Sequence, residues 1–283
     1  MIDLHTHSNH SDGTDDPAAL VRLAALAGVT TISLTDHDTT SGLTEARTEA
    51  TRHRIAFVSG IELSADADGT IVHVLGHYIN EHSRSLQDRL RSLREHRRGR
   101  AEEIVSRLSA DYSITWREVQ NEAAGVDSVG RPHIADTLVA KGYARSRPEV
   151  FATILGNGSP YVPSLPAPTV EEAIALIDEA GGLSTIAHVW GSARGSSSID
   201  GYMLSQWKSV GLSGLEVWHR EHSRVQRAQL LRLADHVGLY TTGGSDYHGT
   251  GKPNQLGEYE TPPHVLDKMA ARVVQRVSAG RVS

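Results

Sequence analysis

The chain has 283 residues, with 28 lysines and arginines against 34 aspartates and glutamates, and it contains no cysteine. The missing cysteine excludes a disulfide scaffold, thiolate metal sites and cysteine nucleophiles, and no run reaches the ~20 apolar residues of a membrane span. The net charge of −6 disfavours a broad surface for coating nucleic acid. We expect a cytoplasmic protein without a signal peptide.

The first third of the sequence alternates between strand and helix patterns. Asp16 and Pro17 are an N-cap and a first-turn proline, which predict the start of one helix. Apolar runs bounded by turn residues predict the strands, and apolar residues at helical spacing predict the helices. The predicted strands are 3–6, 29–35, 55–58 and 70–79. The predicted helices are 17–27, 41–53 and the Arg-rich segment 83–108.

This alternation stops between about 109 and 168. Short helical patterns are followed there by a Gly- and Pro-rich stretch over 156–168, which is typical of a loop-rich return from an inserted subdomain. We therefore expect one domain in two parts, 1–108 and 169–283, with a mainly helical cap formed by 109–168.

The alternation resumes after Thr169, which is a predicted helix N-cap. The predicted strands are 183–187, 214–218 and 239–242. The predicted helices are 170–182, 203–210, 221–236 and one that begins near 264. About seven βα units imply an α/β fold with parallel strands and helical crossovers, either as an open sheet or as a closed barrel.

Histidine is unusually frequent, with 16 histidines against 14 Phe, Trp and Tyr residues. It is the commonest metal ligand. Nearly every predicted strand carries histidines or carboxylates near its C-terminal end, where the loops of parallel-sheet enzymes converge. These residues are His5, His7, Asp12, Asp36, His37, Asp38, Glu62, His73, His77, His188, Glu216, His219, Asp246 and His248.

Two motifs in this set have the spacing of metal ligands. In His5-Thr6-His7 and in Asp246-Tyr247-His248 the first and third side chains share one face of an extended segment. A single motif of this kind is usually incidental. Many carboxylates gathered at one edge without a cation would be costly, however, so the set predicts a polynuclear metal site. Nitrogen and oxygen ligands suit Zn²⁺, Mn²⁺ or Fe²⁺, and Glu62 is suited to bridge two ions ~3.5–4 Å apart.

Six segments together resemble the polymerase and histidinol phosphatase (PHP) family. They are DLHTHS at 3–8, SDG at 11–13, TDHD at 35–38, GIE at 60–62, IAH at 186–188 and GSDYH at 244–248. The resemblance implies a distorted (β/α)7 barrel with two or three divalent metal ions. It assigns His5, His7, Glu62 and Asp246 to one ion, Glu62, His73 and His188 to a second, and Asp12, His37 and His248 to a third. It favours His73 over His77 as a ligand, and Val189 stands where the family often has proline.

The insertion resembles a subgroup of stand-alone PHP phosphoesterases. Arg97-x-x-Arg100 and Gly130-Arg131-Pro132-His133 are similar to motifs of 3′,5′-bisphosphate nucleotidases and 5′–3′ RNA exonucleases. On a helix, Arg97 and Arg100 share one face, and guanidinium groups match phosphate oxygens. We expect Arg97, Arg100, Arg131 and His133 to bind phosphate, although arginine pairs are also common by chance in so Arg-rich a chain.

The predicted activity is hydrolysis of a nucleotide phosphomonoester, either a 3′,5′-bisphosphate or a mononucleotide. A hydroxide that bridges two metal ions would attack phosphorus in line. The predicted catalytic residues are Glu62, Asp246, His133 and Arg131. The leaving group would be protonated by His133 or by a metal-bound water.

Several alternatives stay open on the sequence alone. The chain could be a 5′–3′ exoribonuclease on short RNA 5′ ends or a histidinol-phosphatase-like enzyme for a phosphorylated metabolite. Amidohydrolases also begin with H-x-H, but none of the four lysines is placed to bridge metals. A catalytically silent, metal-stabilised interaction module is disfavoured by the complete ligand set. Tyr112, Trp116 and Tyr143 could stack a base, with core packing the favoured role for two of them. No membrane and no obligate protein partner are expected.

Overall fold

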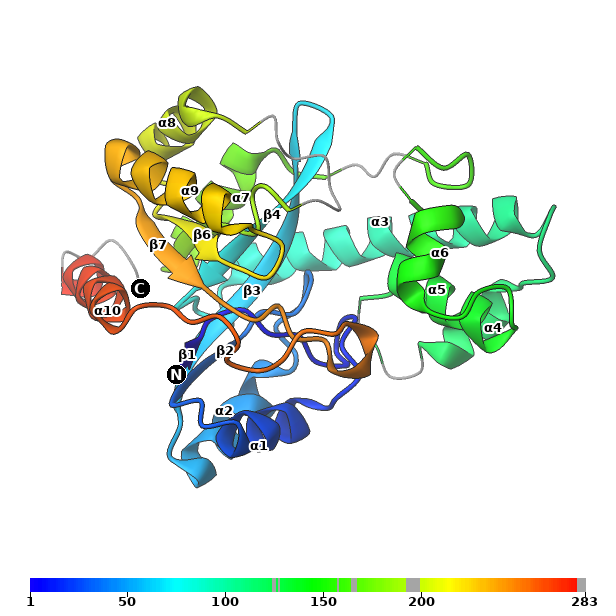
Figure 1. The fold of residues 1–283 in the computed structure, drawn as a ribbon, viewed down its shortest axis with the longest axis horizontal. Coiled ribbons are helices and arrows are strands. Elements are labelled where there is room, and N and C mark those ends of the chain that lie inside the picture. The colour runs from blue at the N-terminus through cyan, green and yellow to red at the C-terminus, as the bar shows by residue number, and fades with distance from the viewer. Residues whose placement is uncertain (124–125, 127, 157, 164–166, 192–198, 279–283) are drawn as a thin grey trace.

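The computed structural model describes residues 1–123, 126, 128–156, 158–163, 167–191 and 199–278. Figure 1 shows a curved sheet with helices around it and a group of short helices at the far end of one long helix. The sheet has seven strands in chain order. They are β1 (Ile2–Asp3), β2 (Thr31–Leu34), β3 (Ala56–Ala67), β4 (Thr70–His77), β5 (Leu183–Ile186), β6 (Gly214–Trp218) and β7 (Tyr240–Gly243).

Backbone hydrogen bonds join the two ends of the sheet. The amide of Asp246 donates to the carbonyl of His5 at 2.8 Å, and the amide of His7 donates to that of Tyr247 at 2.9 Å. The segments after β1 and β7 therefore lie side by side, and the sheet is nearly closed. The predicted distorted (β/α)7 barrel is confirmed.

Two helices begin at the predicted residues, 17 and 170, because their N-caps are strong. Asp16 accepts a hydrogen bond from the amide of Ala19, and Thr169 forms a capping box with Glu172. The helices are α1 (Pro17–Leu26), α2 (Leu43–His53), α3 (Arg84–Leu108), α4 (Trp116–Glu122), α5 (Arg131–Ala140), α6 (Arg147–Thr153), α7 (Val170–Glu179), α8 (Gly201–Ser209), α9 (Arg224–Val237) and α10 (Pro263–Ser278).

One strand contradicts the all-parallel arrangement expected from the βα repeat. β3 continues to Ala67 instead of ending at 58, and the chain returns as β4, which is antiparallel to both β3 and β5. Asp68 and Gly69 make this turn with φ values of 51° and 85°, a conformation typical of tight hairpins. β3 and β4 thus form a hairpin with no crossover helix, and the prediction of seven parallel strands was wrong.

The reversal of β4 separates its two histidines. His73 is paired with Ser64, and its ring reaches the carboxylate of Glu62. His77 is paired with Gly60, farther back along the barrel, and its Nε2 donates to the carbonyl of Leu4 at 2.9 Å. His77 is therefore a buried structural histidine, and His73 is the one that lies among the predicted ligands.

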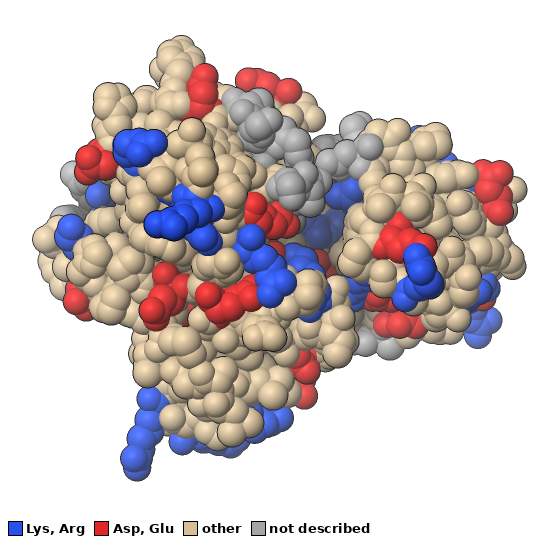
Figure 2. Space-filling view, in the orientation of Figure 1, with Lys and Arg blue, Asp and Glu red and all other residues tan. Residues whose placement is uncertain are grey.

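The short helices form a lobe with its own apolar core. We call α4, α5, α6 and the C-terminal part of α3 the helical lobe. Its core comprises Ala101, Ile104, Val105, Leu108, Ile114, Val119, Ile134, Ala135, Leu138, Val150, Ile154 and Leu155. The lobe thus uses residues of α3 before 109 as well as the predicted insertion, of which 124–125, 127, 157 and 164–166 lie outside the described residues. In the space-filling view the surface is hollowed between the barrel and this lobe, and Lys and Arg side chains lie in the hollow (Figure 2).

Two of the three aromatic residues considered for base stacking pack against the lobe core. Tyr112 and Trp116 are partly buried on it. Tyr143 is more exposed, and its hydroxyl accepts a hydrogen bond from the amide of Ser113 at 2.9 Å. Core packing thus accounts for Tyr112 and Trp116.

Leu215 of β6 is fully buried in the main core. We expect Leu215→Ala to lower the free energy of unfolding of the cation-free protein by about 2–5 kcal/mol, because it leaves a cavity under the barrel helices. Urea denaturation followed by circular dichroism measures this difference. The control Val274→Ala, at a position 64% exposed on α10, should change stability by less than about 0.5 kcal/mol; equal losses in both variants would contradict the core assignment.

Candidate metal centre

The nine predicted metal ligands meet in one buried cluster. Each is at most 9% exposed, and they come from the ends of β1, β2, β5 and β7 and from the β3–β4 hairpin. We call them the ligand cluster, and they are His5, His7, Asp12, His37, Glu62, His73, His188, Asp246 and His248. Their side chains fall into four overlapping groups whose ligand atoms lie within 4.8 Å of one another.

Glu62 is at the centre of this cluster. Its two carboxylate oxygens face imidazole rings from four different parts of the barrel, which is the arrangement of a bridging ligand. The Oε2 atom lies 3.1 Å from His7 Nε2, 3.3 Å from His37 Nδ1 and 3.4 Å from His5 Nε2. The Oε1 atom lies 2.5 Å from His73 Nδ1 and 3.2 Å from His188 Nε2.

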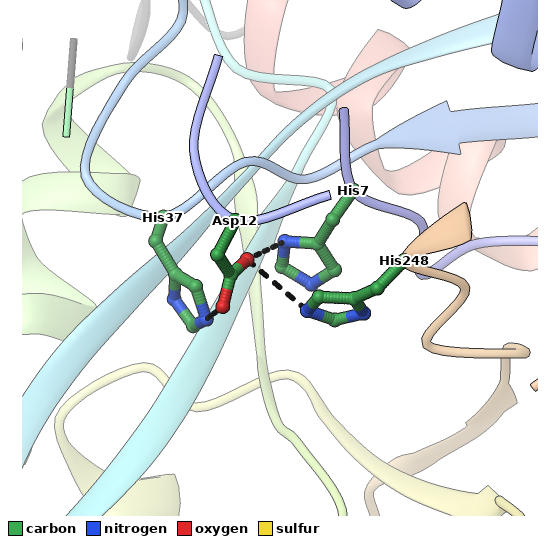
Figure 3. A group of neighbouring side chains, drawn as sticks. All are labelled: His7, Asp12, His37 and His248. Carbon is green, nitrogen blue, oxygen red and sulfur yellow. Dashed lines mark ion pairs between the residues drawn. The ribbon is translucent and has the colours of Figure 1, made fainter. Parts of the chain in front are cut away.

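Asp12 is the centre of a second group (Figure 3). Its Oδ1 lies 3.1 Å from His248 Nε2 and 3.6 Å from His7 Nδ1, and its Oδ2 lies 3.8 Å from His37 Nε2. His7 presents its other ring nitrogen to Glu62. His7 therefore lies between the Asp12 group and the Glu62 group.

Asp246 faces the cluster with one oxygen and Lys252 and His219 with the other. Its Oδ1 is 3.4 Å from both His5 and His7, while its Oδ2 is 2.6 Å from Lys252 Nζ. The φ angle of Asp246 is 52° and that of His188 is 27°, values that non-glycine residues rarely adopt. Such backbone conformations persist where the surrounding structure fixes them, often at functional sites.

Three buried imidazole nitrogens of the cluster lack a well-formed hydrogen bond. Within the part of the chain that the structure describes, His7 Nδ1, His37 Nδ1 and His248 Nε2 are buried and make no hydrogen bond of good geometry, although each lies 3.1–3.6 Å from a carboxylate oxygen of Asp12 or Glu62. Leaving such a group unsatisfied costs about 1–3 kcal/mol each, and coordination of a cation would satisfy it. With only nitrogen and oxygen donors, the residues present fit divalent cations such as Mn²⁺, Fe²⁺ or Zn²⁺.

The electrostatics favour the metal-binding forms of Glu62 and His248 but not that of His7. Burial opposes ionisation of Glu62, but the surrounding histidines hold its pKa well below the usual range. Burial together with the charge of Lys252 lowers the pKa of His248 to about 4. Burial also acts to lower the pKa of His7, but Asp246 and Glu62 outweigh it and raise the pKa to about 9. A cation bound at His7 would therefore displace a proton.

Carboxylates behind the cluster hold its ligands in place. Glu216, which is fully buried, lies with Oε1 3.0 Å from His5 Nδ1, and its Oε2 accepts a hydrogen bond from the amide of His188 at 2.8 Å. Asp36 accepts hydrogen bonds from the hydroxyls of Ser8 and Ser11 at 2.6 Å each. The strand-end pattern contained Glu216, but no local signal distinguishes a ligand from a residue that orients one.

Glu216→Ala should weaken divalent cation binding by about 10–100-fold, because it frees the His5 ring and the His188 backbone together. Glu216→Gln keeps an acceptor oxygen for one of these two groups and should lose less. Isothermal titration of the cation-free proteins with Mn²⁺ measures both. Unchanged Mn²⁺ affinity in Glu216→Ala would show that His5 and His188 are held by other contacts.

The two arginines of α3 that are predicted to bind phosphate have different contacts. Arg97 Nη2 lies 2.7 Å from Asp38 Oδ2 and 2.8 Å from Ser64 Oγ, next to the cluster. Arg100 on the same helix donates from Nε to the carbonyl of Pro163 at 2.9 Å. Asp38 was not among the predicted site residues, although it belongs to the TDHD motif.

His133 and Arg131 both lie in the first turn of α5, but their side chains contact different parts of the molecule. His133 is buried, burial lowers its pKa, and Asp12 is close enough to oppose that shift. Its Nδ1 accepts a hydrogen bond from the amide of Gly130 at 3.1 Å. Arg131 donates to the carbonyl of Leu155 and lies over the ring of Phe151. His133 is thus close to the cluster, whereas these contacts of Arg131 belong to the helical lobe.

Comparisons with known proteins identify relatives that hydrolyse phosphoric esters. The family model described as PHP domain matches residues 3–126. The chain is 32% identical over 272 residues to a 3′,5′-nucleoside bisphosphate phosphatase of Chromobacterium violaceum, covering 93% of both chains. It is 32% identical to the 5′-3′ exoribonuclease Rnm of Escherichia coli, covering 88% of this chain and 85% of that one. A solved structure from Bifidobacterium adolescentis, named as a metal-dependent phosphoesterase, matches with a TM-score of 0.92 and 36% identity over 95% of each chain.

The barrel, the buried ligand cluster and these likenesses define a phosphoric ester hydrolase that depends on metal ions. The chain belongs to the PHP family, which confirms the resemblance seen in its sequence motifs. Among the residues that the structure describes, none of the helices combines the length and apolar character needed to cross a bilayer.

Proposed function

We propose that the protein hydrolyses a phosphomonoester of a nucleotide, either a 3′,5′-bisphosphate or a mononucleotide, at the ligand cluster. The observation that carries the proposal is the position of Glu62, whose single carboxylate meets five imidazole rings. Such a buried, mixed set of carboxylates and imidazoles is typical of sites that hold two or more cations for hydrolysis.

The nine residues of the ligand cluster would hold two or three divalent cations. His5, His7, Glu62 and Asp246 would bind one, Glu62, His73 and His188 a second, and Asp12, His37 and His248 a third. Bound cations would lower the pKa of a water molecule and neutralise charge on the phosphate. His7 would contribute to the third group as well, since its Nδ1 faces Asp12.

Arginines of α3 would bind the phosphate. Arg97 is oriented by Asp38 and Ser64, and a guanidinium fixed in this way binds phosphate oxygens with little loss of entropy. Arg100 lies close enough to Arg97 for the two like charges to interact. An anion between them would relieve that repulsion. Arg131 remains a predicted phosphate ligand, but the contacts described above for it lie within the helical lobe.

His133 would donate a hydrogen bond to the leaving-group oxygen. Because its Nδ1 accepts a hydrogen bond from Gly130, the neutral ring carries its proton on Nε2. His133 is close to Asp12, so this N–H would lie beside the cluster. A neutral imidazole is too weak an acid to protonate an alkoxide, so a metal-bound water would supply the proton.

The substrate class is supported by two of the curated relatives, a nucleoside bisphosphate phosphatase and an exoribonuclease. A panel with added Mn²⁺ tests it, using adenosine 3′,5′-bisphosphate, AMP, a 5′-phosphorylated RNA tetramer and histidinol phosphate. The readouts are release of inorganic phosphate and, for the RNA, release of mononucleotides. We expect kcat/KM of about 10⁴ M⁻¹s⁻¹ or more on one of the nucleotides. Preference for the RNA would favour exoribonuclease activity, and no turnover by cation-loaded protein on any substrate would contradict the proposal.

A further inference from the structure

Arg147, the first residue of α6, connects the helical lobe to the ligand cluster. Its Nε and Nη2 each lie 2.5 Å from an oxygen of Asp136 on α5, forming a two-pronged ion pair within the lobe. Its Nη1 donates to the backbone carbonyl of Asp12 at 2.9 Å. The side chain is only 12% exposed. Arg147 therefore binds, from the lobe, the backbone of a residue whose carboxylate faces three histidines.

The same guanidinium lies against the chain that follows His248. A methyl group at Gly251 would lie 2.4 Å from Arg147 Nη1 and 3.1 Å from its Cζ. A side chain at this position would therefore displace the guanidinium from its present place. Arg147 thus contacts two of the segments that bring ligands to the Asp12 group, the Asp12 loop and the turn after His248.

The loop around Asp12 is held by hydrogen bonds to both the barrel and the helical lobe. On the barrel side, the hydroxyls of Ser8 and Ser11 donate to Asp36. On the lobe side, the hydrogen bond from Arg147 holds the carbonyl of Asp12 itself. A hydrogen bond from a charged donor is stronger than one between neutral groups, and the fork of Asp136 fixes the direction from which it comes.

We propose that Arg147 is a positioning residue for the Asp12–His37–His248 cation site, so that the helical lobe sets the cation affinity of that site. The inference rests on the proposed function, because it takes these three residues as ligands. Arg147 acts through the backbone of Asp12 and through Gly251, and it does not itself contact a cation.

Mn²⁺ binding to the purified full chain tests this inference. In Arg147→Leu we expect one class of Mn²⁺ to bind about 10–100-fold more weakly, with the remaining Mn²⁺ bound as in the wild type. Arg147→Lys should show a smaller loss of the same class, because an ammonium group restores the charge but not the fork. Gly251→Ala should reproduce the selective loss without removing any charge. Arg145→Leu, at a 90% exposed arginine two residues away that pairs with Glu149, is the matched control and should bind Mn²⁺ as the wild type does.

The possible results separate this inference from the proposed function. Wild-type Mn²⁺ affinities in Arg147→Leu would overturn the inference and leave the proposed function standing. An equal weakening of every class in all Arg147 and Gly251 variants, with a lower melting temperature of the cation-free protein, would also overturn it, because Arg147 would then only stabilise the fold. A wild-type protein that binds no Mn²⁺ would refute the proposed function itself, and the inference with it.

Discussion

Glu62→Gln is expected to lower kcat/KM by at least about a thousandfold at an Mn²⁺ concentration that saturates the wild type. The amide keeps the shape of the side chain but removes the negative charge that five histidines face. A bridging carboxylate organises cations that supply several kcal/mol of charge stabilisation, and ~1.4 kcal/mol corresponds to a tenfold change in rate. Initial rates of phosphate release and cation content, measured on the same preparation, should fall together.

The matched control for this change is Glu179→Gln, an exposed glutamate at the end of α7. It should keep wild-type activity and cation content. If Glu62→Gln lost its bound cations but remained active, the bridging role of Glu62 would be wrong and hydrolysis would have to proceed without the cluster.

Asp246→Asn should reduce kcat/KM by about a hundredfold or more. Its Oδ1 faces His5 and His7, while its Oδ2 holds Lys252 at 2.6 Å. The amide therefore weakens cation binding and leaves the lysine without its counter-charge. Addition of Mn²⁺ should then raise the melting temperature much less than it does in the wild type, because stabilisation by a ligand follows its affinity. Differential scanning calorimetry measures this shift.

Asp235→Asn, at an exposed aspartate on α9, controls for loss of a surface carboxylate. It should respond to Mn²⁺ like the wild type. An Asp246→Asn variant with an undiminished Mn²⁺-induced shift would remove Asp246 from the ligand set.

The meeting of the predicted ligands at the strand ends could be predicted from the sequence. Parallel strands bring their C-terminal ends to one edge of the sheet, whatever their separation along the chain. His5 and Asp246 illustrate this, since they are far apart in sequence but have atoms 3.4 Å apart. The direction of β4 could not be predicted in the same way. Asp68 and Gly69 are typical turn residues in the sequence, but the βα repeat on both sides favoured a parallel strand over a hairpin.

The residues that support the cluster were harder to recognise. Glu216 and Asp36 are carboxylates near strand ends, as the predicted ligands are, and only distances reveal that they accept hydrogen bonds from ligand residues and loops. Arg147 is separated from Asp12 by 135 residues. Its role depends on how the lobe packs against the barrel, which no local pattern encodes.

Anomalous diffraction from Mn²⁺-soaked crystals tests the central claim most directly, because it locates the cations by element and position. The account predicts anomalous peaks that share Glu62 as a ligand, with His73 and His188 on one side and His5, His7 and Asp246 on the other. It predicts a further peak beside Asp12 and His248. Crystals of active protein without peaks at Glu62, or with cations bound only elsewhere on the chain, would contradict it.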